Sequence, residues 1–182
     1  MLLNRLLSEG YKVIKSEFHR YDTKTGDLIY QWLTGKWKAS QEVIELIMTS
    51  DKQNQMEWFN ELECQGYDYL ILDRYTLSQF SYGKANGMNI NWLLNLQKYM
   101  RKPDLDIVID IPAEVSMSRK GKHNNGENDR YEADLEMLQR VRDNYLLLPE
   151  KYSAPLKYIV DGTKTIEEIH NDIYQIVIDN LT

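Results

Sequence analysis

The stretch Tyr69-Leu70-Ile71-Leu72-Asp73 is a continuous apolar run that ends on a charged residue and follows a turn. Such a run predicts a strand buried on both faces, as in a parallel sheet covered by helices. Residues 106–111 and 157–161 have the same character, and residues 11–18 also predict a strand. Buried strands of this kind favour an α/β fold with a parallel sheet.

Helical segments alternate with these strands. Apolar side chains recur at helical spacing in the segments 2–7, 28–33, 41–64, 76–82, 90–100, 113–118, 131–148 and 166–177. The segment 41–64 is expected to form one long helix that stops at Gln65-Gly66. Because no internal repeat or Pro-rich linker interrupts the alternation, the sequence predicts a single three-layer α/β/α domain over residues 1–182.

The composition excludes several classes of protein. Apolar residues make up 42% of the chain, charged residues 27%, and the net charge is −6. An acidic chain argues against a nucleic-acid partner and against an anionic membrane surface, and no apolar run approaches the ~20 residues that span a bilayer. The lone cysteine, Cys64, excludes an internal disulfide and indicates a reducing, cytoplasmic setting. The three histidines share no spacing with Cys64 or carboxylates, so no metal site is predicted.

Polar residues follow three of the predicted strands, in Phe18-His19-Arg20-Tyr21, Asp73-Arg74-Tyr75 and Asp110-Ile111-Pro112. In open parallel sheets, ligands bind outside the carboxyl ends of the strands. Arg74 would there direct a permanently charged, forked guanidinium at a phosphate. The alternative is a structural pair between Asp73 and Arg74.

The helix predicted after Arg74 extends this candidate site. Ser78, Gln79 and Tyr82 fall at spacings of one, three and four residues, so they could all face one small ligand.

Several stretches resemble the thymidylate kinase family in order and spacing. The pattern Asp73-Arg74-Tyr75, two residues, Ser78 and an aromatic residue four positions on is similar to a motif of that family. Seven further stretches resemble the family and occur in the same order along the chain as they do in the family. They are residues 18–21, 46–52, 102–105, 112–115, 129–132, 141–145 and 161–163. The resemblance covers essentially the whole chain. It implies a P-loop nucleoside monophosphate kinase fold and phosphoryl transfer from Mg-ATP to dTMP, giving dTDP.

The resemblance also implies a role for each matching residue around dTMP. Arg74, Arg20 and Tyr21 would hold the 5′-phosphate. Tyr82 would crowd the 2′ position of the sugar and so favour deoxyribose, and Gln79 stands where the family contacts the base.

Two positions depart from the family pattern. Met48 replaces the phenylalanine that stacks on thymine, and Lys52 replaces the arginine that reaches a thymine carbonyl oxygen. Methionine gives a softer contact, and lysine lacks the planar fork of arginine. The departures predict a pyrimidine site with looser selectivity for thymine.

The polar segment 119–130 corresponds to the family's lid. Arg119 and Arg130 would stabilise charge during phosphoryl transfer, which depends on positioning and electrostatics. The alternative is a solvated basic loop. Asp73 would help to place a metal ion or its water, or would instead pair with Arg74 or Arg20.

The loop G-x-x-x-x-G-K-[ST], which cradles the phosphates of ATP and holds Mg²⁺, has no match in the 182 residues. The resemblance implies that the central strand of the family's sheet is absent with it. Strands 69–73 and 106–111 are then expected either to pair directly or to leave open edges that another chain fills, as in a homodimer with exchanged strands. Binding of ATP and Mg²⁺ and kinase turnover are expected to be weak or lost.

Three explanations stay open for the missing loop. In the first, the reading frame starts at an internal methionine. In the second, the protein is a catalytically silent, nucleotide-binding regulator or inhibitor of a protein partner. In the third, the fold serves a structural or partner-binding purpose. The joint presence of Arg20, Tyr21, Arg74, Gln79 and Tyr82 favours a working monophosphate site over the third explanation.

Overall fold

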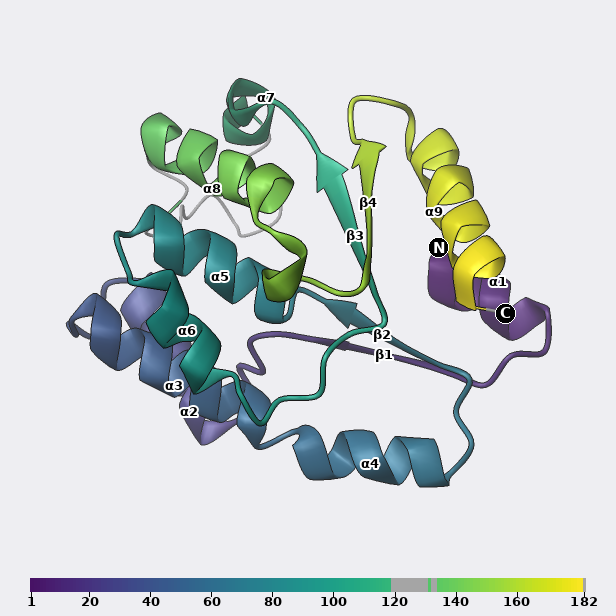
Figure 1. Cartoon of the computed structure of the whole chain (residues 1–182), viewed down its shortest axis with the longest axis horizontal. Coiled ribbons are helices and arrows are strands. Elements are labelled where there is room, and N and C mark those ends of the chain that lie inside the picture. The colour runs from purple at the N-terminus through teal and green to yellow at the C-terminus, as the bar shows by residue number, and fades with distance from the viewer. Residues whose placement is uncertain (119–130, 132–133, 182) are drawn as a thin grey trace.

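The computed structural model describes residues 1–118, 131 and 134–181. Helices and strands alternate along the chain, as the sequence predicts (Figure 1). The strands are β1 (Val13–Glu17), β2 (Tyr69–Asp73), β3 (Leu105–Asp110) and β4 (Leu156–Asp161). The helices are α1 (Leu2–Ser8), α2 (Lys24–Leu33), α3 (Gln41–Gln53), α4 (Met56–Cys64), α5 (Thr76–Ala85), α6 (Ile90–Leu96), α7 (Ala113–Ser118), α8 (Leu135–Leu147) and α9 (Ile166–Leu181), with a 3-10 turn η1 (Glu150–Tyr152).

Each strand pairs in parallel with one neighbour. The register sets Val13–Glu17 against Tyr69–Asp73 and Leu105–Asp110 against Leu156–Asp161. Within the described ranges no ladder joins β2 to β3, so the strands form two separate two-stranded sheets, which run in different directions in the view of Figure 1. The expectation that β2 and β3 pair directly is therefore wrong, and the alternative of open strand edges is confirmed.

Helices cover the strands in layers (Figure 1). Helices α1 and α9 lie side by side and connect the two sheets through an apolar cluster that includes Leu6, Ile71, Ile107 and Val177. Val108 points to the opposite face of β3, where it packs in a cluster with residues of α5 and α6. Helices α5 and α8 pack against each other on that side. The predicted α/β architecture with helices on both faces is confirmed.

The expected single helix over 41–64 is wrong, because the structure divides it into α3 and α4. At the break, the N–H of Gln55 donates to the carbonyl oxygen of Lys52, three residues back, which tightens the last turn. The two helices then pack against different clusters. Met48 of α3 joins the cluster of α2 and α8, whereas Phe59 of α4 packs against Phe18 and Tyr75 near the ends of β1 and β2.

Side-chain caps define the start of several helices. Thr23 accepts a hydrogen bond from the N–H of Gly26 at the start of α2, and Ser40 accepts one from Val43 at the start of α3. Asp134 caps α8 in the same way, so this helix begins at Leu135. In the part of the chain that the structure describes, no helix has both the length and the apolar character needed to cross a membrane.

Candidate functional site

Arg74 follows β2 directly and has a left-handed backbone conformation, with φ of 64°. This conformation is strained for a residue with a side chain, and such strain is found at functional sites, where the surrounding structure maintains it. The side chain is exposed, and its guanidinium carbon lies 5.4 Å from the centre of the Tyr82 ring. Interaction with Tyr82 raises the pKa of Arg74 above its ordinary value. A permanent cation at the carboxyl end of a parallel strand suits a phosphate.

Four aromatic rings, Trp32, Tyr82, Tyr131 and Tyr145, form a wall beside Arg74. The ring centre of Tyr82 lies 5.1 Å from that of Tyr131 and 6.3 Å from that of Tyr145. Trp32 continues the wall, 5.6 Å from Tyr131. Burial raises the pKa of Tyr145 to about 12, so its hydroxyl stays protonated near neutral pH. Trp32 and Tyr131 are buried in the core, so only the half-buried Tyr82 and Tyr145 have surface that a ligand next to the cation could contact.

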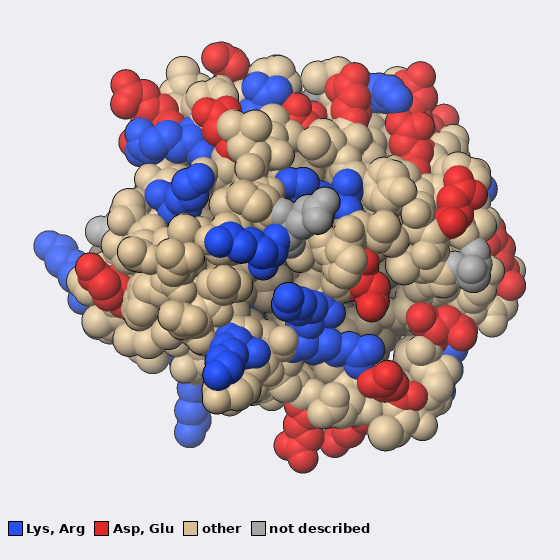
Figure 2. Space-filling model, viewed as in Figure 1, with Lys and Arg blue, Asp and Glu red and all other residues tan. Residues whose placement is uncertain are grey.

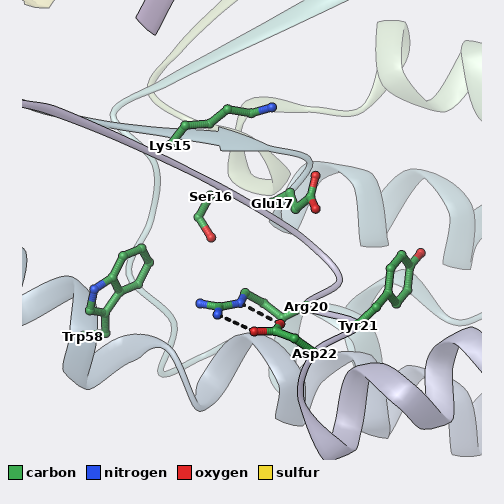
Figure 3. A pocket seen from close by; sticks show the side chains of 7 residues that line it. All are labelled: Lys15, Ser16, Glu17, Arg20, Tyr21, Asp22 and Trp58. Atoms are coloured by element: carbon green, nitrogen blue, oxygen red, sulfur yellow. Dashed lines mark hydrogen bonds and ion pairs between the residues drawn. The ribbon is translucent and has the colours of Figure 1, made fainter. Parts of the chain in front are cut away.

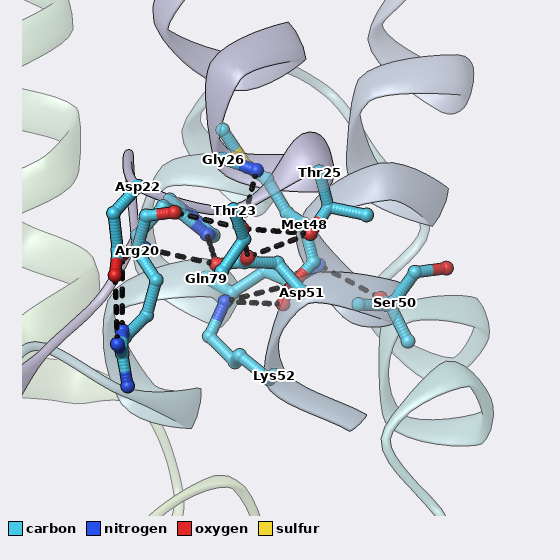
Figure 4. Close-up of polar contacts among 12 residues, drawn as sticks. Arg20, Asp22, Thr23, Thr25, Gly26, Met48, Ser50, Asp51, Lys52 and Gln79 are labelled. Atoms are coloured by element: carbon cyan, nitrogen blue, oxygen red, sulfur yellow. Dashed lines mark hydrogen bonds and ion pairs between the residues drawn. The ribbon is translucent and has the colours of Figure 1, made fainter. Parts of the chain in front are cut away.

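A buried triad, Glu45, Gln79 and Lys52, joins α3 to α5. Figure 4 shows the Lys52 and Gln79 side chains of this triad. Lys52 Nζ donates to Gln79 Oε1 at 3.0 Å and to the carbonyl oxygen of Met48 at 3.3 Å. Gln79 Nε2 donates to Glu45 Oε2 at 2.9 Å, to the Glu45 carbonyl oxygen at 3.0 Å and to Thr49 Oγ1 at 3.1 Å. Because Lys52 and Glu45 are each only 1% exposed, the Gln79 amide bridges a buried cation and a buried anion.

Burial shifts both ends of the triad toward their neutral forms. Desolvation lowers the pKa of Lys52 from 10.5 to about 7, against the opposing effect of the Glu45 and Asp51 charges. Desolvation raises the pKa of Glu45, and this is opposed by hydrogen bonds from Gln41 and Gln79 and by the charge of Lys52. The charge of Lys52 therefore favours the ionised form of Glu45, and the charge of Glu45 favours the protonated form of Lys52. Because its pKa is about 7, Lys52 loses its proton as the pH rises through neutrality.

Asp51 fixes the segment that follows β1 (Figure 4). Its Oδ1 accepts from the hydroxyls of Thr23 at 3.0 Å and Thr25 at 2.8 Å. Its Oδ2 lies 3.1 Å from His19 Nδ1 and accepts from the N–H of Arg20 at 3.2 Å. Burial raises the pKa of Asp51, but the hydrogen bonds, first from His19 and Thr25, outweigh burial and hold the pKa below its usual value. Burial lowers the pKa of His19 to about 4, so the neutral ring directs its Nδ1 proton at the carboxylate.

Arg20 lies in a separate cavity at the edge of β1 (Figure 3). Its guanidinium forms a forked pair with Asp22, at 3.2 Å and 2.9 Å, and donates to Gln55 Oε1 at 3.4 Å. The open cavity has a volume of about 550 Å³, and Tyr21 and Trp58 are among the residues that line it. In Figure 3 the Arg20 side chain extends toward Trp58.

The structure thus divides the predicted site residues into two groups. The first group surrounds the aromatic wall and the buried triad: Arg74, Tyr82, Gln79, Lys52 and Met48. The second group, Arg20 and Tyr21, lines the cavity at β1. The Arg20 side chain contacts Asp22 and Gln55, whereas the Arg74 side chain lies against Tyr82. Asp73 is exposed and lies 3.9 Å from Lys15, its ion-pair partner. Arg119 and Arg130, with the predicted lid 119–130, lie outside the described residues.

Basic side chains gather on one face of the molecule despite the net charge of −6. Figure 2 shows Lys and Arg around a hollow in the middle of this face, with many of the Asp and Glu side chains toward its rim. Such a distribution attracts an anionic ligand to the hollow. Residues 1–118, 131 and 134–181 contain no group of three or more His, Cys, Asp or Glu side chains placed to hold a metal ion.

Sequence reasoning missed four residues that build the site. Asp51 and Glu45 act through partners on other elements, and Tyr131 and Tyr145 reach Tyr82 from distant parts of the chain. A signal existed for Glu45. Together with Thr49 and Lys52 it falls at helical spacing on one face of α3, which could have indicated a polar face directed inward.

Comparisons with known proteins show the family and the fold of this chain. A sequence model described as thymidylate kinase matches residues 1–173. A probable thymidylate kinase of Thermococcus onnurineus is 32% identical over 188 residues, which cover 95% of this chain and 88% of that protein. A second, of Thermococcus gammatolerans, is also 32% identical and covers 93% of this chain and 83% of that protein. The structure is similar to that of thymidylate kinase from Candida albicans, with a TM-score of 0.80, 25% identity, and coverage of 98% of this chain and 85% of that one.

Proposed function

We propose that this chain, which belongs to the thymidylate kinase family, binds dTMP as the acceptor of a phosphoryl group. The observation that carries the proposal is the exposed, strained Arg74 beside Tyr82 at the end of a parallel strand. Arg74 would bind the 5′-phosphate, and Tyr82 would pack against the sugar at its 2′ position. The Lys52 and Gln79 ends of the buried triad would face the pyrimidine, with Met48 beside it.

Arg20 and Tyr21 would join the phosphate site through a change of partner. The Arg20 guanidinium is now bound to the Asp22 carboxylate, which presents two oxygens to it. A phosphate offers the same forked geometry with more charge. We propose that dTMP releases Arg20 from Asp22, and that Arg119 and Arg130 add positive charge from the segment 119–130.

We propose that this chain does not form a Mg-ATP site by itself. The 182 residues contain no G-x-x-x-x-G-K-[ST] loop, whose backbone N–H groups and lysine would bind the ATP phosphates. Backbone donors and a lysine of this kind contribute several kcal/mol to the transition state. We therefore propose that this chain alone holds the acceptor nucleotide and converts little or no dTMP to dTDP.

Calorimetric titration with dTMP tests the acceptor site. We expect a dissociation constant on the order of micromolar for the intact chain. Arg74→Ala should weaken binding by about 100-fold, because a charge-assisted, forked hydrogen bond is lost. Arg140→Ala is the matched control, since Arg140 is exposed on α8 and pairs with Glu136 of the same helix. Equal affinities for the intact chain and for Arg74→Ala would refute the assignment of Arg74.

A coupled assay with dTMP and Mg-ATP tests the second part of the proposal. Turnover near ~1 per second, an ordinary rate for an enzyme, would show that the chain carries a working ATP site. Binding of dTMP without turnover would instead support a nucleotide-binding role such as regulation.

A further inference from the structure

The outer edge of β1 has no strand beside it in the part of the chain that the structure describes, because β1 pairs only with β2. The cavity beside Arg20 and Trp58 lies along this edge, and Lys15, Ser16 and Glu17 of β1 help to line it (Figure 3). We infer that this edge binds an extended segment of a partner protein as an added strand. The segment carries a basic, a large apolar and an acidic residue in that order. The inference goes beyond the proposed function and does not depend on it.

The hydrogen bonds to β2 determine which backbone groups of β1 face outward. The N–H of Phe18 donates to the carbonyl oxygen of Asp73, and the carbonyl oxygen of Lys12 accepts from β2. In a parallel ladder, residues that bond to one neighbour alternate with residues whose N–H and C=O groups face the other side. The even-numbered residues of β1 therefore bond to β2, and Lys15 and Glu17 direct their backbone groups outward. Each of these two residues offers one donor and one acceptor to another strand.

The side chains of Lys15 and Glu17 determine which charges an added strand should carry. They lie two residues apart on one face of the sheet, and both are exposed. Lys15 has an ion pair of 3.9 Å with Asp73, but the two side chains are 48% and 61% exposed, so this pair is weak. An antiparallel strand, whose pairing is the more stable one, would place an acidic residue opposite Lys15 and a basic residue opposite Glu17. Because this strand runs in the opposite direction, its basic residue comes first.

Ser16 points to the other face of the sheet, on which α4 packs. Its ladder partner Leu72 belongs to the apolar cluster that includes Trp58. The residue opposite Ser16 on an added strand directs its side chain to the same face, and so into the cavity of about 550 Å³. The charges of Arg20 and Asp22, which also line the cavity, are paired with each other. The half-buried ring of Trp58 therefore favours a large apolar side chain at this position.

A second copy of this chain fits the edge less well than a different protein does. Because β1 itself reads Lys15-Ser16-Glu17, two copies paired in antiparallel would match the charges. Ser16 would then lie opposite Ser16 of the other copy, and its hydroxymethyl group is too small to fill the cavity beside Trp58. A large apolar side chain between the two charges requires a different chain. The partner is therefore a protein with an extended segment that reads basic, apolar, acidic.

Amide hydrogen exchange of the intact chain, followed by NMR, tests the added strand. The probe is a short, end-blocked peptide with the central sequence arginine-leucine-aspartate and threonine on both sides. At saturation, we expect exchange at the N–H groups of Lys15 and Glu17 to slow at least about tenfold, because each gains a hydrogen bond. The N–H of Phe18, which already donates to Asp73, should change little. Protection of Lys15 and Glu17 without the peptide would show that another copy occupies the edge, and would overturn the inference.

Peptides with N-methyl groups separate backbone pairing from attraction between side chains. In the inferred register, the N–H groups of the arginine and the aspartate face β1, whereas the N–H of the leucine faces away. Methyl groups on the first two nitrogens should weaken binding at least about tenfold, and a methyl group on the leucine nitrogen should change it by less than about threefold. An equal loss for the two peptides would contradict the added strand.

Trp58→Ala tests the cavity, with Tyr99→Ala as the matched control, because Tyr99 is 77% exposed and does not line the cavity. We expect Trp58→Ala to weaken peptide binding at least about tenfold and Tyr99→Ala to leave it unchanged. Equal affinities for folded Trp58→Ala and the intact chain would overturn the role of the cavity.

A double variant, Lys15→Glu with Glu17→Lys, tests the charges and decides the matter if Trp58→Ala does not fold. Both side chains are exposed and the net charge is unchanged. The intact chain should prefer the arginine-leucine-aspartate peptide over one that reads aspartate-leucine-arginine, and the double variant should reverse this preference. An unchanged preference, or no binding of either peptide to the intact chain, would overturn the inference.

Discussion

His19 is a buried histidine that stays neutral beside an ionised aspartate. Its pKa is lowered from 6.5 to about 4, first by burial and then by the charge of Lys52. As pH falls below 6.5 the unfolded chain binds a proton at this position, whereas the folded chain does so only near pH 4. Stability is therefore lost across this window, by on the order of 3 kcal/mol for this group. We expect His19→Gln, whose amide can still donate to Asp51, to flatten that loss in urea unfolding measured at a series of pH values.

His170 provides the comparison for this prediction. It lies partly exposed on α9, where burial also lowers its pKa. Since burial lowers the pKa of His170 less than that of His19, His170→Gln should change the pH profile much less than His19→Gln. The same flattening in both variants would show that the effect does not come from the burial of His19.

Gly26, in the first turn of α2, shows how one element constrains the segment before it. A Cβ at this position would collide with the carbonyl oxygen of Arg20, because the segment after β1 folds back over the helix start. We expect Gly26→Ala to reduce the free energy of unfolding by about 1–3 kcal/mol, as overpacking does, and to weaken dTMP binding by displacing Arg20. Chemical unfolding and calorimetry measure the two effects. Lys24→Ala, an exposed change in the same turn, should alter stability by less than about 0.5 kcal/mol.

The elements themselves were largely predictable, because strands and helices depend on local patterns. The run Tyr69–Asp73 forms a strand with those bounds, and residues 106–111 differ from β3 by one position. The break between α3 and α4 had a signal that the sequence analysis did not use, because no apolar residue occurs between Met48 and Met56. What separates the two helices is their packing against different clusters, around Met48 in one and Phe59 in the other.

At the scale of the whole molecule, the sequence indicated which strand ends carry the site but not how the side chains pair across it. Arg74 lies at the end of β2 as expected, since its place depends only on the strand before it. The pairing of Arg20 with Asp22 depends on a turn fixed by Asp51 from another helix. The buried triad likewise depends on the contact between α3 and α5, which no local pattern specifies.

The open edges of β2 and β3 lead to a prediction for the assembled protein. Each of these strands has a ladder partner on one side only among the described residues, so backbone N–H and C=O groups on the other side are available to a second chain. Ile109 of β3, 51% exposed, adds apolar surface on one face of this strand. We expect concentration-dependent self-association, consistent with a homodimer, in sedimentation velocity. Ile109→Lys should shift this association to higher concentration without lowering the melting temperature, because a charge on an open strand disfavours pairing with another chain.

Leu147→Lys, at a residue 77% exposed on α8, is the control for a general effect of added charge. An equal shift in both variants, or a monomer at all concentrations, would show that the strand edges do not mediate association.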